Sequence, residues 1–179
     1  PIIKDKLFFS LGYEKYEASD PISLLGFQSG SVTKAEADAV IKAATDVIGY
    51  DAGTYNKARE EEDEKTFLRL DANLSENHNL TFSYNLTEGF TESAYFNRTW
   101  GLPLSSNWYR INKEYESMKL ELNSNWTDNF STKILISDTD VSNPNTPVGA
   151  TTIGEVGIRV ASGGTVFFGP DQYRHANQI

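Results

Sequence analysis

The feature that most constrains this chain is a pair of alternating segments within residues 65–88, KTFLRLDANLSENHNLTFSYNLTE. Apolar side chains occupy every second position of 68–74 and again of 80–86, with polar side chains between them. A period of two places the apolar side chains on one face of a strand and the polar ones on the other. The polar tetrapeptide 75–78 is typical of a turn. The sequence therefore predicts a β-hairpin with one apolar and one polar face.

Two classes of protein use such a hairpin. A soluble β-sandwich, for example a surface, adhesion or carbohydrate-binding module, buries the apolar face in a core, whereas an outer-membrane barrel turns it toward lipid. Each arm has about ten residues, which matches the ~9–11 residues that a tilted strand needs to cross a bilayer and exceeds the ~5–6 of a typical soluble strand. Strand length therefore favours the barrel and leaves the sandwich as the alternative.

Composition excludes several other classes. The chain of 179 residues has a net charge of −9 and no basic stripe, so we expect no nucleic-acid partner. It has no run of ~18 apolar residues, which excludes a membrane-spanning helix. The absence of cysteine leaves the redox compartment open. Because the sequence opens on PIIKDK, with neither a start methionine nor a signal peptide, we expect a piece of a longer protein.

The same alternation recurs along the chain and predicts an all-β fold, an antiparallel up-and-down meander. The predicted strands are residues 7–16, 65–74, 79–88, 114–126 and 130–138. Gly12, inside the first of them, suggests a bend, a bulge or the close approach of another group.

The connections between these strands alternate strictly between long and short. Long loops are predicted at residues 17–64, 89–113 and 139–179, and turns of three or four residues separate the other strands. Outer-membrane barrels have short periplasmic turns and long extracellular loops. The pattern therefore predicts a segment of a transmembrane barrel.

A small helix is predicted inside the first long loop, at residues 33–48. Thr33 and Glu36 have the spacing of a capping box, and Gly49 is a plausible stop. The side expected to pack comprises Val40, Ile41, Ala44 and Val47.

Shorter features surround this helix. The acidic run 60–64 is interpreted as a solvated part of the first loop. Two short strands are expected at 154–160 and 164–168, and a short helix after Pro170.

Three segments carry a resemblance to a known family. They read PIIKDKLFFSLGYEKYE, TFLRLDANLSENHNLTFSYN and GGTVFFGPDQYRHANQ, and they resemble consecutive landmarks in the barrel of TonB-dependent outer-membrane receptors of the Oar-like (OmpA-related) subgroup. The third segment is the most specific of them. Ser10 departs from the pattern, which usually has an aromatic residue at that position.

The resemblance implies a location in the bacterial outer membrane and active uptake of a ligand. Receptors of this kind have a barrel of about 22 strands closed by an N-terminal plug. Energy reaches them through TonB, which contacts their N-terminal region. The expected partners are thus outer-membrane lipid, an unidentified ligand, and TonB through the N-terminal region of the parent protein. Only about five strands and no plug are present, so we expect the fragment not to be competent alone, and no functional residue of the family is carried over.

The loop 89–113 is the predicted ligand-contact region because it is rich in aromatic residues. Exposed rings offer broad apolar surface with a polar edge, and binding residues concentrate in loops on a rigid scaffold. The candidate ligand-binding residues are Tyr95, Trp100, Trp108 and Tyr109. The alternative is that these rings pack the loops against each other.

No catalytic activity, cofactor or metal site is predicted. The sequence lacks the nucleophile-elbow, phosphate-loop and dinucleotide motifs. His78 and His175 lie far apart and outside any metal-ligand spacing. The pair Glu114 and Glu116 is interpreted as lining of a polar lumen rather than as a glycosidase site.

Overall fold

The computed structural model describes residues 2–171. The chain divides into two compact units, which are described separately. The first unit comprises residues up to 17 together with 62–89 and 113–143, and it contains most of the long strands. The second unit comprises residues 18–61, 90–112 and those from 144 onward, so it is built from the three connections predicted to be long.

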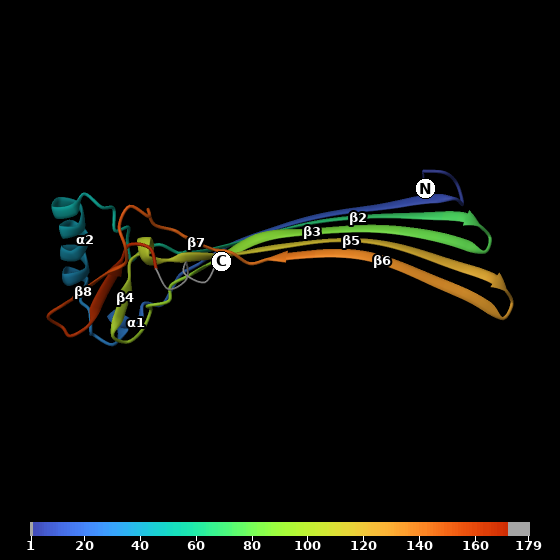
Figure 1. The fold of residues 1–179 in the computed structure, drawn as a ribbon. Coiled ribbons are helices and arrows are strands. Elements are labelled where there is room, and N and C mark those ends of the chain that lie inside the picture. The colour runs from blue at the N-terminus through green and yellow to red at the C-terminus, as the bar shows by residue number, and fades with distance from the viewer. Residues whose placement is uncertain (1, 172–179) are drawn as a thin grey trace. The chain divides into compact units, whose positions relative to one another are not determined.

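Five long strands form an antiparallel meander, as the sequence predicts (Figure 1). Their order in the sheet is β1-β2-β3-β5-β6, so strands that follow one another along the chain lie side by side and only the short β4 is skipped. Their bounds are β1 Leu7–Asp20, β2 Arg59–Ser75, β3 His78–Ser93, β5 Tyr109–Thr127 and β6 Phe130–Ser142. Each is longer than predicted. Within the described residues β1 and β6 are the edges of this sheet, and it does not close into a barrel.

The register of β5 and β6 fixes which side chains share a face. Leu120 pairs with Ile136 and Leu122 pairs with Ile134, and the register shifts only next to the turn, between Asn125 and Thr127. Residues directly opposite each other in a sheet point to the same side. One face of this pair of strands is therefore apolar, as the alternation predicts.

The acidic run 60–64 lies inside β2, and its assignment to a solvated loop is wrong. Glu and Asp are depleted in strands, so the run gives no strand signal. The neighbouring strand supplies a countercharge, because Lys15 Nζ lies 3.1 Å from an Oε1 atom of both Glu62 and Glu64 and 2.8 Å from Glu17 Oε1. Cross-strand ion pairs thus let β2 extend through the acidic run.

Gly12 of β1 lies beside Phe67 of β2. A Cβ atom at this position would lie 3.8 Å from Phe67 Cβ and 4.0 Å from its ring. Phe67 therefore lies beside Gly12 across the sheet, at a distance that a Cβ atom would also allow. These are ordinary contact distances, so the structure does not require glycine here for a close approach.

The second unit contains a small sheet and two helices. Strand β8 (Val156–Arg159) pairs antiparallel with β9 (Thr165–Phe168), which confirms the two short strands predicted there. Strand β4 (Gly101–Pro103) pairs with β9 in parallel, which departs from the antiparallel expectation because the two strands come from different long connections. The remaining elements are α1 (Leu25–Gln28), the 3₁₀ turn η1 (Ser105–Asn107) and β7 (Asn145–Pro147), which pairs with β5.

Helix α2 (Lys34–Ile48) forms where it is predicted. The Thr33 hydroxyl accepts a bond from the Glu36 amide, and the Glu36 carboxylate accepts one from the Thr33 amide, which completes the capping box. The helix ends at Gly49, whose φ of +65° lies in the left-handed region that favours glycine. No helix within residues 2–171 is long and apolar enough to span a membrane.

The packed side of α2 differs from the prediction at its last turn. Ala37, Val40 and Ala44 are buried and Ile41 packs against them, but Val47 is 79% exposed. Val47 lines the rim of an open apolar groove of about 560 Å³, which runs between α2 and β8. Since no described residue of this unit fills the groove, Val47 stays in solvent.

All three long connections contribute to one hydrophobic core in the second unit. Its buried members are Val32, Ala37, Val40, Ala44, Tyr50, Ala52, Leu102, Leu104, Val166 and Phe168. The Tyr50 hydroxyl donates to the Ala150 carbonyl at 2.9 Å. The expected loops are therefore a folded unit with a core of its own. The helix predicted after Pro170, together with His175, lies outside the described residues.

Candidate functional site

Two of the predicted ligand-binding residues form an exposed aromatic surface between β3 and β4. Tyr95 is 40% exposed and Trp100 is 50% exposed. Both lie edge-on to Phe96, at centroid distances of 5.1 and 6.3 Å. Phe96 in turn stacks on Phe167 of β9 at 4.2 Å. We call these four rings the aromatic platform.

The loop that carries the platform is held by hydrogen bonds to the first long connection. Asn97 Oδ1 accepts the Leu25 amide at 2.9 Å, and Asn97 Nδ2 donates to the Ser23 carbonyl at 2.8 Å. The hydroxyls of Ser29 and Ser31 both donate to the Thr99 carbonyl at 2.5 Å. These bonds preorganise the loop, which lowers the entropy that a bound ligand would have to overcome.

Arg98 adds a positive charge beside the platform. Its guanidinium carbon lies 5.3 Å from the centroid of the Tyr95 ring, within the range of a cation–π contact. The surface thus combines apolar ring faces with a cation at one edge, a combination that suits ligands with both apolar and anionic parts.

The other two predicted residues do not reach the surface. Trp108 is fully buried, and its indole Nε1 donates to the Pro103 carbonyl at 3.3 Å. Tyr109, the first residue of β5, is buried as well. The structure brings Tyr95 and Trp100 together and separates them from Trp108 and Tyr109, which belong to the packing of the second unit.

A buried ion cluster joins the first and second long connections within the second unit. The side chain of Glu92 is fully buried. Both of its carboxylate oxygens accept a hydrogen bond from Lys57 Nζ, at 2.7 Å. Arg110 Nε donates to Glu92 Oε1 at 3.2 Å, and the Glu60 amide donates to Oε2 at 3.2 Å. Arg110 also reaches Glu60 Oε2 at 3.2 Å. We call these four residues the Glu92 cluster.

The cations of the Glu92 cluster also lie over aromatic rings. Lys57 Nζ is 5.7 Å from the Trp108 ring centroid, and the Arg110 guanidinium is 4.1 Å from that of Phe90. The buried carboxylate is therefore fully compensated by bonds and charges of this chain. Such a cluster fixes the packing of its segments and leaves no open position for a ligand.

A second buried polar group lies around Asn107 of η1. Its Nδ2 donates to the Gly169 carbonyl at 2.9 Å and to Glu155 Oε2 at 3.3 Å. Burial raises the pKa of Glu155, and the charge of Asp171 raises it further. The bonds tie the 3₁₀ turn to the segment after β9, which again is a structural role.

The N-terminus of α2 is tied to the turn between β8 and β9. Glu36 Oε1 accepts the Ser162 amide at 2.8 Å and the Ser162 hydroxyl at 3.1 Å. The backbone bonds from Thr33 and Ser162 lower the pKa of Glu36 to about 2. This carboxylate is fully occupied by bonds within the chain.

The described residues contain no group of three or more His, Cys, Asp or Glu side chains able to hold a metal ion. His78 packs against Trp126, with ring centroids 4.9 Å apart. Glu114 and Glu116 lie opposite Ser142 and Asp140, on the same face as Met118, so they end the apolar face instead of lining the polar one.

Sequence reasoning missed two residues that shape the candidate surface. Phe167 of β9 stacks on Phe96 of the aromatic loop, although the two residues lie more than sixty positions apart along the chain. The sequence indicated only that Phe167 belongs to a strand, not that it contacts this loop. Glu92 gave no signal, because a single Glu in a polar segment is indistinguishable from a solvated one.

Comparison of the chain with known protein families, with curated proteins and with solved structures finds no match.

Proposed function

We propose that these residues form part of the barrel of a TonB-dependent outer-membrane receptor, which takes up a ligand. The long strands face lipid, and the second unit carries the ligand-contact surface. The observation that carries this proposal is the exposed apolar face of β5 and β6. Leu120 is 39% exposed and its partner Ile136 is 65% exposed, and Ile134 beside them is also exposed.

An apolar face of this kind needs an apolar neighbour. Large contiguous apolar surface is rare on soluble monomers. In a soluble sandwich a second sheet would cover it, but the described residues of the first unit contain no second sheet. Lipid would cover this apolar face without a second protein sheet.

The height of the apolar face suits a bilayer. Ten residues separate Glu116 from Trp126, which is about 34 Å along a strand. With the usual strand tilt of 35–45° this span rises about 25 Å, the height of the apolar band of outer-membrane barrels. Amphipathic rings mark both ends: the Tyr84 hydroxyl donates to Glu116 at 3.0 Å, and Trp126 Nε1 donates to the Thr132 hydroxyl at 2.9 Å.

The opposite face carries charges suited to a water-filled lumen. Lys133 Nζ lies 2.9 Å from Glu121 Oε2, and Arg69 Nε lies 2.8 Å from Asp71 Oδ2. In a barrel the inward face is polar and the outward face apolar. The open edges of β1 and β6 fit the same proposal, because further strands of a complete barrel would pair with them.

The ligand would contact the aromatic platform, whose exposed members Tyr95 and Trp100 remain candidate ligand-binding residues. Their rings are rigid and preorganised, as in many recognition surfaces. Trp108 and Tyr109 would support this surface from within. Contact with TonB would belong to the N-terminal region of the parent protein, and location in the outer membrane follows from the barrel.

Spin labels on β5 would test the lipid-facing assignment. The 179 residues contain no cysteine, so single cysteines can be introduced at Met118, Leu120 and Leu122 and, as matched controls one residue away, at Lys119, Glu121 and Asn123. The complete protein that contains these residues would be reconstituted in lipid bilayers. Collisions with oxygen, which concentrates in lipid, and with a water-soluble nickel chelate would be measured by electron paramagnetic resonance.

We expect the first three labels to collide with oxygen and the other three with the nickel chelate, in strict alternation. A soluble sandwich would instead shield the first three labels from both reagents. That outcome, or a loss of the alternation, would show that lipid does not cover this face.

A further inference from the structure

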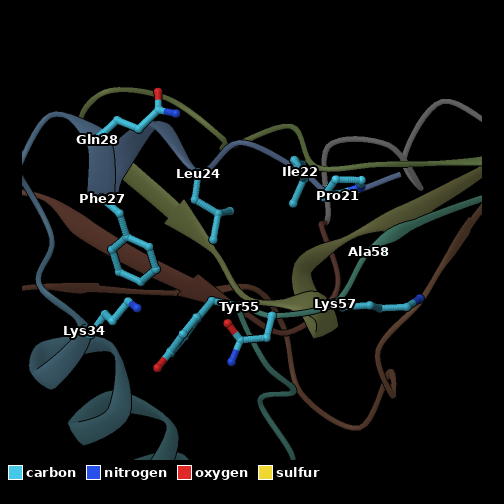
Figure 2. A pocket seen from close by; sticks show the side chains of 10 residues that line it. Pro21, Ile22, Leu24, Phe27, Gln28, Lys34, Tyr55, Lys57 and Ala58 are labelled. Carbon is cyan, nitrogen blue, oxygen red and sulfur yellow. The ribbon is translucent and has the colours of Figure 1, made fainter. Parts of the chain in front are cut away.

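A cleft of about 380 Å³ opens within the second unit (Figure 2), and no residue of the aromatic platform lines it. All ten residues that line it belong to the first long connection, 18–61. Its volume lies within the range of ~300–1,000 Å³ that is usual for small-molecule sites. Neither the resemblance nor the platform assigns a role to this cleft.

Two aromatic rings form one wall of the cleft. Phe27 and Tyr55 meet edge to face, with centroids 5.1 Å apart and an interplanar angle of 88°. The Tyr55 hydroxyl donates to Asp38 Oδ1 at 2.9 Å, which occupies its polar end. Both rings also pack against the core. Tyr55 therefore offers the cleft a fixed ring rather than a free hydroxyl.

The two lysines of the cleft differ in their charge balance. The Lys57 ammonium is bound by Glu92, and in Figure 2 it points away from the rings. The Lys34 side chain reaches toward Phe27 and Tyr55 in the same view, and within residues 2–171 its ammonium has no hydrogen bond or ion pair. The cleft thus contains one ammonium without an ion pair among the described residues, beside two ring surfaces, and the nearby Asp38 carboxylate is engaged by the Tyr55 hydroxyl.

These features define the chemistry of a ligand. A single ammonium matches a single negative charge, whereas multiply charged phosphates are usually held by forked guanidinium groups or by the free amides of a helix N-terminus. The Glu36 amide at the N-terminus of α2 is already occupied by the capping box. The side-chain amides of Gln28 and Asn56 add neutral polar groups to the lining, and its remaining residues are apolar: Pro21, Ile22, Leu24 and Ala58.

We propose that this cleft binds a small organic carboxylate with a flat apolar body. The carboxylate pairs with the Lys34 ammonium, and the body lies against the rings of Phe27 and Tyr55. The proposal rests only on residues 18–61 and requires neither lipid nor uptake, so it stands or fails independently of the barrel.

Benzoate is a suitable probe, with benzyl alcohol as the neutral compound of similar shape. The full chain, labelled with ¹⁵N in detergent solution, would be titrated with each compound, and the backbone amides of Phe27, Lys34 and Tyr55 would be followed by NMR. Site-specific shifts separate binding in the cleft from partition into detergent. We expect saturable shifts with benzoate and an affinity at least about tenfold lower for benzyl alcohol, because the charge-assisted bond is lost.

Variants of two lysines on the same helix provide the matched comparison. We expect Lys34→Gln to weaken benzoate binding at least about tenfold and Lys34→Arg to retain most of it, since only the charge-assisted bond distinguishes them. Lys42→Gln makes the same charge change where the lysine already pairs with Asp46, and it should leave binding unchanged. Equal affinity of Lys34→Gln and the wild-type chain, or shifts that do not saturate, would overturn the proposal.

Discussion

Replacing Glu92 with Gln tests whether the Glu92 cluster holds the second unit together. The substitution keeps the size of the side chain and removes its charge. Lys57 then loses a carboxylate that contacts it at 2.7 Å through both oxygens, and Arg110 loses a contact at 3.2 Å. Gln can accept the Glu60 amide bond, so the loss is confined to the two cations.

The expected cost follows from burial. Breaking a buried ion pair by removing one partner costs about 3–5 kcal/mol, because the other charge stays buried and uncompensated. Here the Lys57 side chain is 24% exposed and that of Arg110 is 38% exposed, so both remain partly hydrated. Arg110 also keeps its contact with Glu60. We therefore expect a smaller loss, about 2–3 kcal/mol in the stability of the second unit.

Hydrogen exchange in the full chain measures this loss locally. The Leu104 amide donates to the Phe167 carbonyl at 2.8 Å, and the Thr165 amide donates to the Trp100 carbonyl at 2.9 Å. Both bonds join β9 to the second long connection. We expect their exchange to become about 30 to 140 times faster in Glu92→Gln, since each 1.4 kcal/mol is a factor of ten.

The matched control is Asp46→Asn, which neutralises a carboxylate in an exposed pair with Lys42 on α2. Pairs of this kind contribute about 0.3–0.5 kcal/mol, so exchange should change by less than threefold. If Glu92→Gln accelerates exchange no more than Asp46→Asn does, the cluster does not stabilise the second unit. A double-mutant cycle with Lys57→Met would then show whether the pair is coupled at all.

Two further predictions concern α2 and the aromatic residues. The bonds that lower the pKa of Glu36 to about 2, from an ordinary value of 4.5, make its stabilising contribution complete above about pH 4.5 and lost as the pH falls toward 2. The protection of the Ser162 amide against exchange should decline across that range, and in Glu36→Gln, whose amide does not titrate, it should be independent of pH; an identical profile in both chains would contradict this. For the rings, Trp108→Ala should cost about 3–5 kcal/mol and lower the amount of folded protein, because the side chain is fully buried. Trp100→Ala should lower ligand uptake by the parent receptor while its heat-modifiable gel mobility is kept, and a loss of uptake strictly in step with surface amount would make Trp100 a packing residue too.

The sequence predicts those strands and that helix whose pattern lies within the segment itself. Alternation in 68–74 and 80–86 identified β2 and β3, and the capping box of Thr33 and Glu36 identified the start of α2. The start of β2, residues 59–64, was missed because the run 60–64 is charged on both faces. Its strand conformation depends on Lys15 in β1, which no local pattern can indicate.

The site was predictable only in part, for the same reason. An aromatic loop predicts rings near a surface, but the burial of Trp108 and the exposure of Trp100 depend on segments far away in the chain. Trp108 lies under Lys57 from the first connection, whereas Trp100 lies beside Phe167 of β9. The local sequence predicts the same exposure for both tryptophans, and only the contacts made in the folded core show that Trp108 is buried and Trp100 is exposed.

The parallel pairing of β4 with β9 sets an order on folding. Gly101 pairs with Thr165, so this contact closes a long loop, whereas the hairpin turns between β2 and β3 and between β5 and β6 close within a few residues. Closure of long loops is slow, and parallel pairing is slower than a hairpin. The second unit cannot be complete until β9 has been made and delivered. Until then the partners of β9 in the first two connections lack it, which is the stage at which chaperones and proteases compete for an incomplete core.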